Sequence, residues 1–156
     1  MEKFFKTTSP EATAGLGEAL GRALAGRNGL VYLTGDLGAG KTTLMQGIAS
    51  GLGLDARVTS PTFALVNAYG RDEEAVYHMD LYRLEDMDEL MEIGFEDFLA
   101  DETLIFVEWP DLLLNEGYAP LAAIDLRRDP ANAVSRIICF KTADASLAER
   151  VAEFES

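Results

Sequence analysis

Apolar positions in the first third of the chain change from helical to strand spacing. A short apolar pair at residues 4–5 predicts a first strand. Between residues 12 and 24, apolar side chains recur every three or four positions, and Ser9 and Pro10 supply a helix cap and a proline suited to the first turn. We expect a helix there, then a glycine-containing turn and a buried strand at the continuous apolar run of residues 30–33.

The middle of the chain predicts a hairpin. Residues 63–69 and 75–80 have strand-like composition, and the polar segment 70–73 between them begins with glycine. The helix that precedes this hairpin should start near Lys41. It should end near residues 51–53, where two glycines flank a leucine.

An acidic stretch follows the hairpin. Apolar side chains repeat every three or four residues between Leu84 and Phe98, and the segment 85–102 holds nine acids and no base. We expect an acidic amphipathic helix that is broken near Gly94. Its apolar stripe is interpreted as core that faces the sheet, with a docking groove for a partner as the alternative.

The last third of the chain predicts mainly strands. Residues 103–108 form an apolar run that ends on an acid, residues 121–126 and 134–140 form a late pair, and residues 145–154 predict a terminal helix. Strands and helices alternate early and strands pair locally later. We therefore expect an α/β three-layer fold with a mixed, mainly parallel sheet and a late antiparallel strand pair.

One segment carries a complete phosphate-binding motif. After the apolar run the chain reads Gly35-Asp36-Leu37-Gly38-Ala39-Gly40-Lys41-Thr42, and Thr43 follows. Glycines allow positive φ angles, so successive N–H groups can point into one concavity at a helix N-terminus. Lys41 would reach the β- and γ-phosphates, and the Thr42 hydroxyl would bind the bridging Mg²⁺. The motif predicts the P-loop NTPase variant of the three-layer fold. No Asn-Lys-x-Asp tetrad for reading guanine is present, so ATP is the expected nucleotide.

Two acids are candidates for the hydrolytic step. Hydrolysis needs an acid at a neighbouring strand end, to hold Mg²⁺ through water or to orient the attacking water. Glu108 ends the run 104–107, and the last residue of a strand buried on both faces is expected to emerge at the sheet edge beside the loop. Asp80 ends its strand in the same manner, although it could instead cap a helix that begins near Leu84.

Three further residues lie near these acids in the sequence. Thr62, in Ser60-Pro61-Thr62, could sense the γ-phosphate and Mg²⁺, or the proline could simply set the entry into a strand. His78, the chain's single histidine, is interpreted as a core or rim residue rather than a base. Trp109 could seal the core, shield the phosphates or meet a partner.

Composition narrows the classes of function. The 156 residues are expected to form a single domain, residues 1–156, and no apolar run approaches the roughly 18 residues of a membrane span. We expect a soluble, cytoplasmic protein. The formal charge of −14 should repel a nucleic-acid backbone, while a basic protein partner remains compatible with it. The single cysteine, Cys139, lies in an apolar run and is expected to be a buried small hydrophobe.

Four separated motifs together resemble those of the TsaE family of bacterial ATPases. They are the phosphate loop with Thr43, then Ser60-Pro61-Thr62-Phe63, His78-Met79-Asp80-Leu81-Tyr82-Arg83 and Val107-Glu108-Trp109-Pro110. The resemblance implies an accessory ATPase for the threonylcarbamoyladenosine modification of tRNA. Such proteins are weak ATPases alone, bind the TsaB–TsaD transferase heterodimer and reset it between turnovers.

The resemblance also implies roles for individual residues. Lys41 and Thr42 would hold phosphate and Mg²⁺, Glu108 would be the metal-site acid, and Asp80 would be required for hydrolysis. Thr62 matches a switch-like loop, and Trp109 matches a residue needed for function. Two regions match the family less clearly: Ser9 and Thr13 fall where its first segment approaches the adenine, and Arg128 and Arg136 are the candidates for its nucleotide-side arginine.

Two other classes of function remain open at this point. A small-molecule kinase could use the same loop, but it would need a cationic lid, and no arginine-rich lid segment is found in the sequence. A nucleotide-gated binding module with little turnover would use Thr62 and the acidic face of residues 85–102 to change its affinity for a partner.

Overall fold

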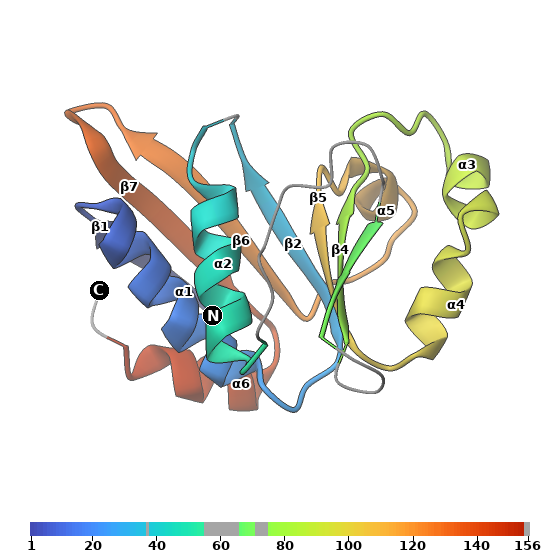
Figure 1. Ribbon diagram of the computed structural model, residues 1–156, viewed down its shortest axis with the longest axis horizontal. Helices are drawn as coiled ribbons and strands as arrows, with labels where there is room; N and C mark the ends of the chain where they lie inside the picture. The colour runs from blue at the N-terminus through green and yellow to red at the C-terminus, as the bar shows by residue number, and fades with distance from the viewer. Residues whose placement is uncertain (37, 55–65, 71–74, 155–156) are drawn as a thin grey trace.

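The computed structural model describes residues 1–36, 38–54, 66–70 and 75–154. Its described strands form one sheet in the order β1-β7-β6-β2-β5-β4-β3 (Figure 1). The strands are β1 (Glu2–Thr7), β2 (Gly29–Gly35), β3 (Val66–Tyr69), β4 (Val76–Asp80), β5 (Leu104–Glu108), β6 (Ala122–Asp129) and β7 (Asn132–Lys141).

The centre of the sheet is parallel and its two edges are antiparallel. Strand β2 pairs in parallel with β5 and with β6, and β4 pairs in parallel with β5. The β6–β7, β1–β7 and β3–β4 pairs are antiparallel. The expected mixed α/β sheet, its late antiparallel pair and the hairpin are therefore confirmed, although residues 63–65 and 71–73 of that hairpin lie outside the described residues. The parallel centre sends the carboxyl ends of β2, β5 and β4 to the same edge, at the top of Figure 1.

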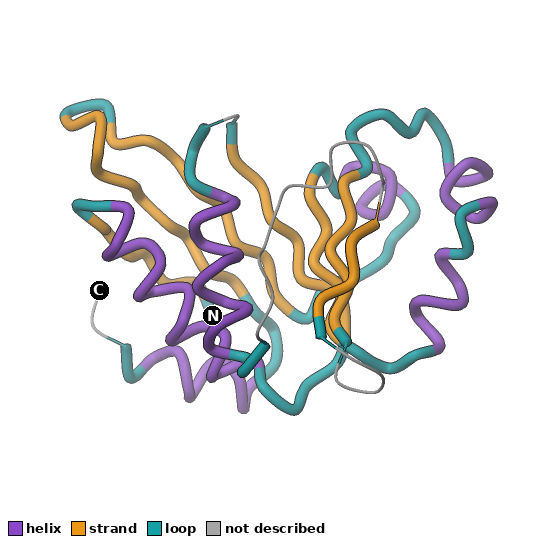
Figure 2. Tube along the Cα trace, in the orientation of Figure 1, coloured by secondary structure: helices purple, strands orange, loops and turns teal. Residues whose placement is uncertain are grey.

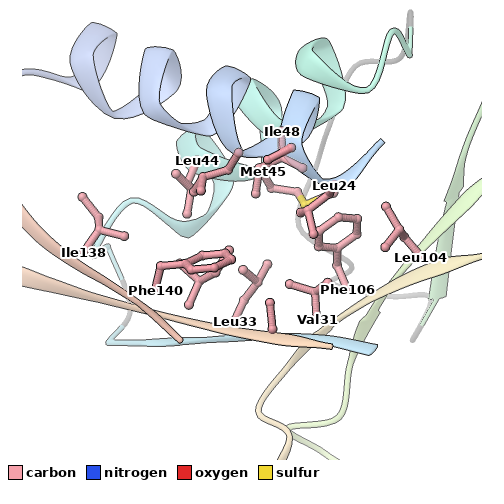
Figure 3. Close-up of a cluster of buried hydrophobic side chains, with 14 of the residues drawn as sticks. Leu24, Val31, Leu33, Leu44, Met45, Ile48, Leu104, Phe106, Ile138 and Phe140 are labelled. Atoms are coloured by element: carbon pink, nitrogen blue, oxygen red, sulfur yellow. The ribbon is translucent and has the colours of Figure 1, made fainter. Parts of the chain in front are cut away.

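Three helices cover one face of the sheet (Figures 1 and 2). They are α1 (Pro10–Leu24), α2 (Lys41–Gly51) and α6 (Ala145–Ala152). Helix α1 begins as predicted, because the Ser9 side chain accepts a hydrogen bond from the Ala12 N–H. Beneath these helices lies a core of branched and aromatic side chains from β2, β5 and β7, part of which is drawn in Figure 3.

Within the described residues, the other face is covered over β2, β5 and β4 only. Helices α3 (Met87–Glu92), α4 (Phe95–Ala100) and α5 (Asp111–Asn115) enclose a second core built on Leu90 and Phe95. The acidic segment is thus two short helices separated at Gly94, whose φ angle of 90° suits glycine. Its apolar stripe packs on the sheet as core, as the pattern predicted. Helix α5 was not predicted, because its five residues are too few to show a helical period.

Cys139 corrects one expectation. The thiol was expected in the core, but the residue is only partly buried, on the face of β7 that carries Phe4 and Asp125 as its cross-strand neighbours. Within the described residues, the enclosed second core lies over β2, β5 and β4, away from β1 and β7. An apolar run in a strand at the margin of a sheet therefore does not ensure burial on both faces. No helix among the described residues combines the length and apolar character needed to cross a bilayer.

Asp144 gives a first testable prediction, on pH-dependent stability. Its carboxylate caps α6 by accepting from the Leu147 N–H at 2.8 Å and pairs with Arg27 at 2.9 Å. The cap lowers the pKa of Asp144, and Arg27 lowers it further. A depressed carboxyl pKa stabilises the fold above the unfolded-state value, and this stability is lost as pH falls through the folded-state pKa.

We therefore expect Asp144→Ala to lower the melting temperature at pH 7. This difference in melting temperature from wild type should close below about pH 4. Asp144→Asn is the matched control, since it keeps an acceptor for the cap but loses the charge. Its melting temperature at pH 7 should lie between those of wild type and Asp144→Ala. Thermal unfolding from pH 7 to pH 3 measures both gaps. A gap for Asp144→Ala that is constant over this range would contradict the assignment.

Candidate functional site

The predicted phosphate-binding segment lies where β2 leaves the sheet. Gly35 is the last residue of β2, and a Cβ added there would lie 2.6 Å from the Leu126 carbonyl oxygen of β6. Gly38 and Gly40 have φ angles of 79° and 104°, in the region that favours glycine. Gly40 is the N-cap of α2 and has no side chain to cap the first turn, which leaves that turn suited to an anion.

Two arginines of the β6–β7 hairpin support this loop from outside. The Arg128 guanidinium donates to the Gly38 carbonyl at 3.2 Å, and Arg136 Nε donates to the Ala39 carbonyl at 2.8 Å. Sequence alone could not choose between these two residues. The structure brings both to the loop, where they donate to its carbonyls and add positive charge.

Lys41 and Glu108 meet at the carboxyl edge of the sheet. Lys41 begins α2, and its ammonium donates to the Gly35 carbonyl at 2.8 Å and lies 3.4 Å from Oε1 of Glu108. The register of β2 and β5 places Leu33 opposite Glu108, so the acid ends its strand directly beside the loop. Its position is as predicted, but its exposure is not: Glu108 is only 6% exposed, because Lys41 and His78 cover it.

The surroundings of Glu108 keep it ionised. Burial alone would raise the pKa of this carboxyl, but hydrogen bonds and charge from His78 and Lys41 outweigh burial and hold the pKa below its ordinary value. His78 Nε2 lies 2.7 Å from Glu108 Oε2. The sequence indicated a core or rim histidine here, and no signal within the chain's local pattern could have paired it with Glu108.

Asp80 lies next to Glu108 on the neighbouring strand. The two acids are paired in the β4–β5 register, and the Leu81 N–H donates to the Glu108 carbonyl at 3.1 Å. Burial, with the nearby Glu108 charge, raises the pKa of Asp80, although a hydrogen bond from the Tyr82 N–H opposes this. The helix-cap alternative for Asp80 is wrong, since Asp86 caps α3. The two carboxyls therefore have pKa values shifted in opposite directions, as is common in catalytic pairs.

Trp109 covers the outer side of Lys41. Its φ angle is 56°, an uncommon value for a residue with a side chain, and it turns the chain directly after β5. The Trp109 ring centroid lies 5.0 Å from the Lys41 ammonium and 4.9 Å from the ring centroid of Tyr82. Trp109 is 39% exposed and Tyr82 is 68% exposed. The indole therefore does not seal the core, and it lies where it can shield the phosphate-binding segment or meet a partner.

A small cavity of about 110 Å³ adjoins the start of α2. It is lined by residues that include Thr13 of α1, Gly40 and Thr43 of the loop, and Arg136 of β7. Thr13, expected on the adenine side, therefore lies within reach of the loop, whereas Ser9 is used as the α1 cap. Thr42 and Thr43 form the first turn of α2. Leu37 and Thr62 lie outside the described residues.

The donor set fits a magnesium nucleotide. Glu108 contacts Lys41 in the first turn of α2, which also carries Thr42, and Asp80 ends the adjacent strand beside Glu108. Hard oxygen donors of this kind suit Mg²⁺, which keeps several waters and is held by one or two protein groups plus phosphates. No cluster of three or more histidine, cysteine or acidic residues that could hold a metal ion is found in the described residues.

The sequence matches a known protein family over most of its length. The family model described as "Threonylcarbamoyl adenosine biosynthesis protein TsaE" matches residues 7–138. The chain belongs to the TsaE family. The matched range contains the described phosphate-binding residues, both strand-end acids and both arginines of the β6–β7 hairpin.

Individual TsaE proteins show how far the likeness extends. The Haemophilus influenzae protein is 43% identical over 95 residues, which cover 61% of this chain and 59% of that protein. The Bacillus subtilis protein is 38% identical over 109 residues, covering 70% of this chain and 67% of that protein. Both are named "tRNA threonylcarbamoyladenosine biosynthesis protein TsaE". The crystal structure of Bacillus subtilis YdiB superposes with a TM-score of 0.71 at 28% identity, over 98% of this chain and 93% of that one. The α/β fold is therefore shared as well.

Proposed function

We propose that this chain is a Mg²⁺-dependent ATPase that serves as an accessory factor in the threonylcarbamoyladenosine modification of tRNA. The observation that carries the proposal is the buried contact between Lys41 and Glu108, at 3.4 Å, at the start of a helix with a glycine at its N-cap. A phosphate-binding cation and an ionised carboxylate are thereby held together. Membership of the TsaE family supports the link to tRNA modification.

The residues divide the chemistry among them. The N–H groups of the loop and the Lys41 ammonium would bind the β- and γ-phosphates, and Lys41 would exchange its contacts with Gly35 and Glu108 for phosphate oxygens. Thr42 and Glu108 would hold Mg²⁺, directly or through water. When bound, Mg²⁺ would offset the negative charge that develops on the phosphates. Asp80, whose raised pKa favours accepting a proton, would orient the attacking water.

Partner proteins are part of the proposal. The exposed Trp109 and Tyr82 rings lie beside the phosphate-binding segment, so a bound protein could complete the site there. We propose that the partners are the TsaB and TsaD transferase subunits, and that hydrolysis resets their complex between turnovers. The formal charge of −14 favours protein contacts over direct binding to tRNA.

ATP turnover with and without the purified TsaB–TsaD heterodimer tests this function. We expect slow phosphate release by the chain alone and a severalfold rise when the heterodimer is added. Lys41→Ala should show no turnover in either condition, because it removes the cation that offsets the transferred charge. Turnover that does not respond to the heterodimer would contradict the proposed cycle. ADP formation that depends on a metabolite would instead favour a kinase.

A further inference from the structure

His78 is a buried histidine, and each of its two ring nitrogens contacts another side chain. It is 1% exposed on β4. Its Nε2 lies 2.7 Å from Glu108 Oε2, and its Nδ1 lies 3.2 Å from the hydroxyl of Tyr69 on the neighbouring strand β3. Tyr69 is itself 4% exposed. Three buried side chains from three adjacent strands therefore form a row that ends on the acid of the site.

The direction of these hydrogen bonds follows from the charge on Glu108. An ionised carboxylate can only accept, so the hydrogen between the two side chains belongs to His78 Nε2. The other ring nitrogen, Nδ1, accepts from the Tyr69 hydroxyl when the ring is neutral and donates to the hydroxyl oxygen when the ring is protonated. The tyrosine oxygen can in turn accept from the Asn67 amide nitrogen, at 3.5 Å. Contacts at both ring nitrogens fix the plane of the imidazole ring.

The two carboxylate oxygens of Glu108 have different partners. Oε2 is held by His78, whereas Oε1 points toward Lys41 at 3.4 Å. When Lys41 turns to a phosphate, its contact with Oε1 is lost, but the bond from His78 to Oε2 does not depend on Lys41. The carboxylate can therefore keep its orientation while Oε1 becomes available.

We propose that His78 is a positioning residue, which holds Glu108 so that Oε1 is the oxygen offered to the Mg²⁺ site. This inference rests on the proposed ATPase function. A purely structural role explains the contacts less well, because His78 lies opposite Phe106 in the sheet register, in a core where an apolar side chain would pack without desolvating an imidazole. Hydrogen-bonded partners of metal-binding carboxylates commonly tune metal affinity in this way.

Two conservative substitutions separate positioning from packing. In His78→Gln the side-chain amide can reach the place of Nε2 and still donate to Glu108. In His78→Asn the shorter amide reaches only the place of Nδ1, toward Tyr69, and leaves Glu108 without this donor. Calorimetry of ATP binding in EDTA and in excess Mg²⁺ gives the gain in affinity due to the metal. Steady-state turnover gives kcat and KM, and thermal unfolding checks that both variants fold.

We expect both variants to bind ATP in EDTA as tightly as wild type, because the phosphate-binding segment is unchanged. His78→Asn should lose about 10-fold or more of the Mg²⁺-dependent gain in affinity, with a matching loss in kcat, while His78→Gln keeps most of both. Equal behaviour of the two variants in Mg²⁺ would overturn the positioning role. If wild type binds no ATP in either condition, the proposed function itself fails, which is a different outcome from equal variants.

Discussion

Glu108→Gln should reduce ATP turnover by about 10²–10³-fold while ATP still binds. The substitution keeps the size of the side chain, and its amide can keep a polar contact with His78. The main change in the variant is therefore the loss of one negative charge. The carboxylate is ionised in the wild type, since His78 and Lys41 hold its pKa below the ordinary value. Its loss therefore removes a charge that the site uses at neutral pH.

The measurements are phosphate release in the presence of the TsaB–TsaD heterodimer, ATP affinity by calorimetry, and tRNA modification in a reconstituted reaction. Glu116→Gln is the control, because Glu116 is an exposed acid at the end of α5, outside the site. We expect modification to fail in Glu108→Gln together with hydrolysis. If modification continues without hydrolysis, the chain is a nucleotide-gated binding module and the ATPase proposal is wrong.

Gly47→Ala should destabilise the fold by about 3 kcal/mol, or about 10 °C in melting temperature. Helices α1 and α2 approach so closely that a Cβ on Gly47 would lie 2.1 Å from the Ala14 carbonyl oxygen. The same holds at Gly51, which faces the Glu18 carbonyl at 2.1 Å, and at Gly17, which faces the Leu44 carbonyl at 2.4 Å. These obstacles are backbone atoms, so the helices themselves would have to move apart.

Gly15→Ala, on the neighbouring helix α1, is the matched control for Gly47→Ala on α2. No atom lies within 4 Å of a Cβ added at Gly15, so alanine should raise stability by up to about 1 kcal/mol through its better helix propensity. Thermal and urea unfolding of the two variants give the comparison. Similar stabilities for Gly47→Ala and Gly15→Ala would show that the helices do not pack as described. Because α2 starts at Lys41, we also expect Gly47→Ala to weaken ATP binding.

Local signals account for what was predicted well. Helix α1 was bounded by its cap and its apolar period, and the break at Gly94 followed from one glycine in an amphipathic stretch. The strand-end positions of Asp80 and Glu108 followed from apolar runs that stop at an acid. Each of these signals involves residues within a few positions of one another, so a linear pattern contains it.

The exposure of individual side chains could not be read in the same way. Glu108 was expected to emerge at the sheet edge, yet Lys41 and His78 cover it. Cys139 was expected to be buried, yet it lies partly exposed on a margin of the sheet. In both cases the exposure of the side chain depends on which elements lie over the strand. An apolar run indicates only that the strand itself is extended and largely buried.

The sequence by itself determined the glycine-rich turn between β2 and α2, the alternation of helices and strands, and the acids that end β4 and β5, because short-range sterics and hydrogen bonding set these features. The tertiary structure alone decided which side chains meet. His78 bonds to Glu108 across 30 positions, and Arg136 reaches the Ala39 carbonyl across 97 positions. Such contacts depend on strand order and register, which arise from packing the whole sheet beneath its helices.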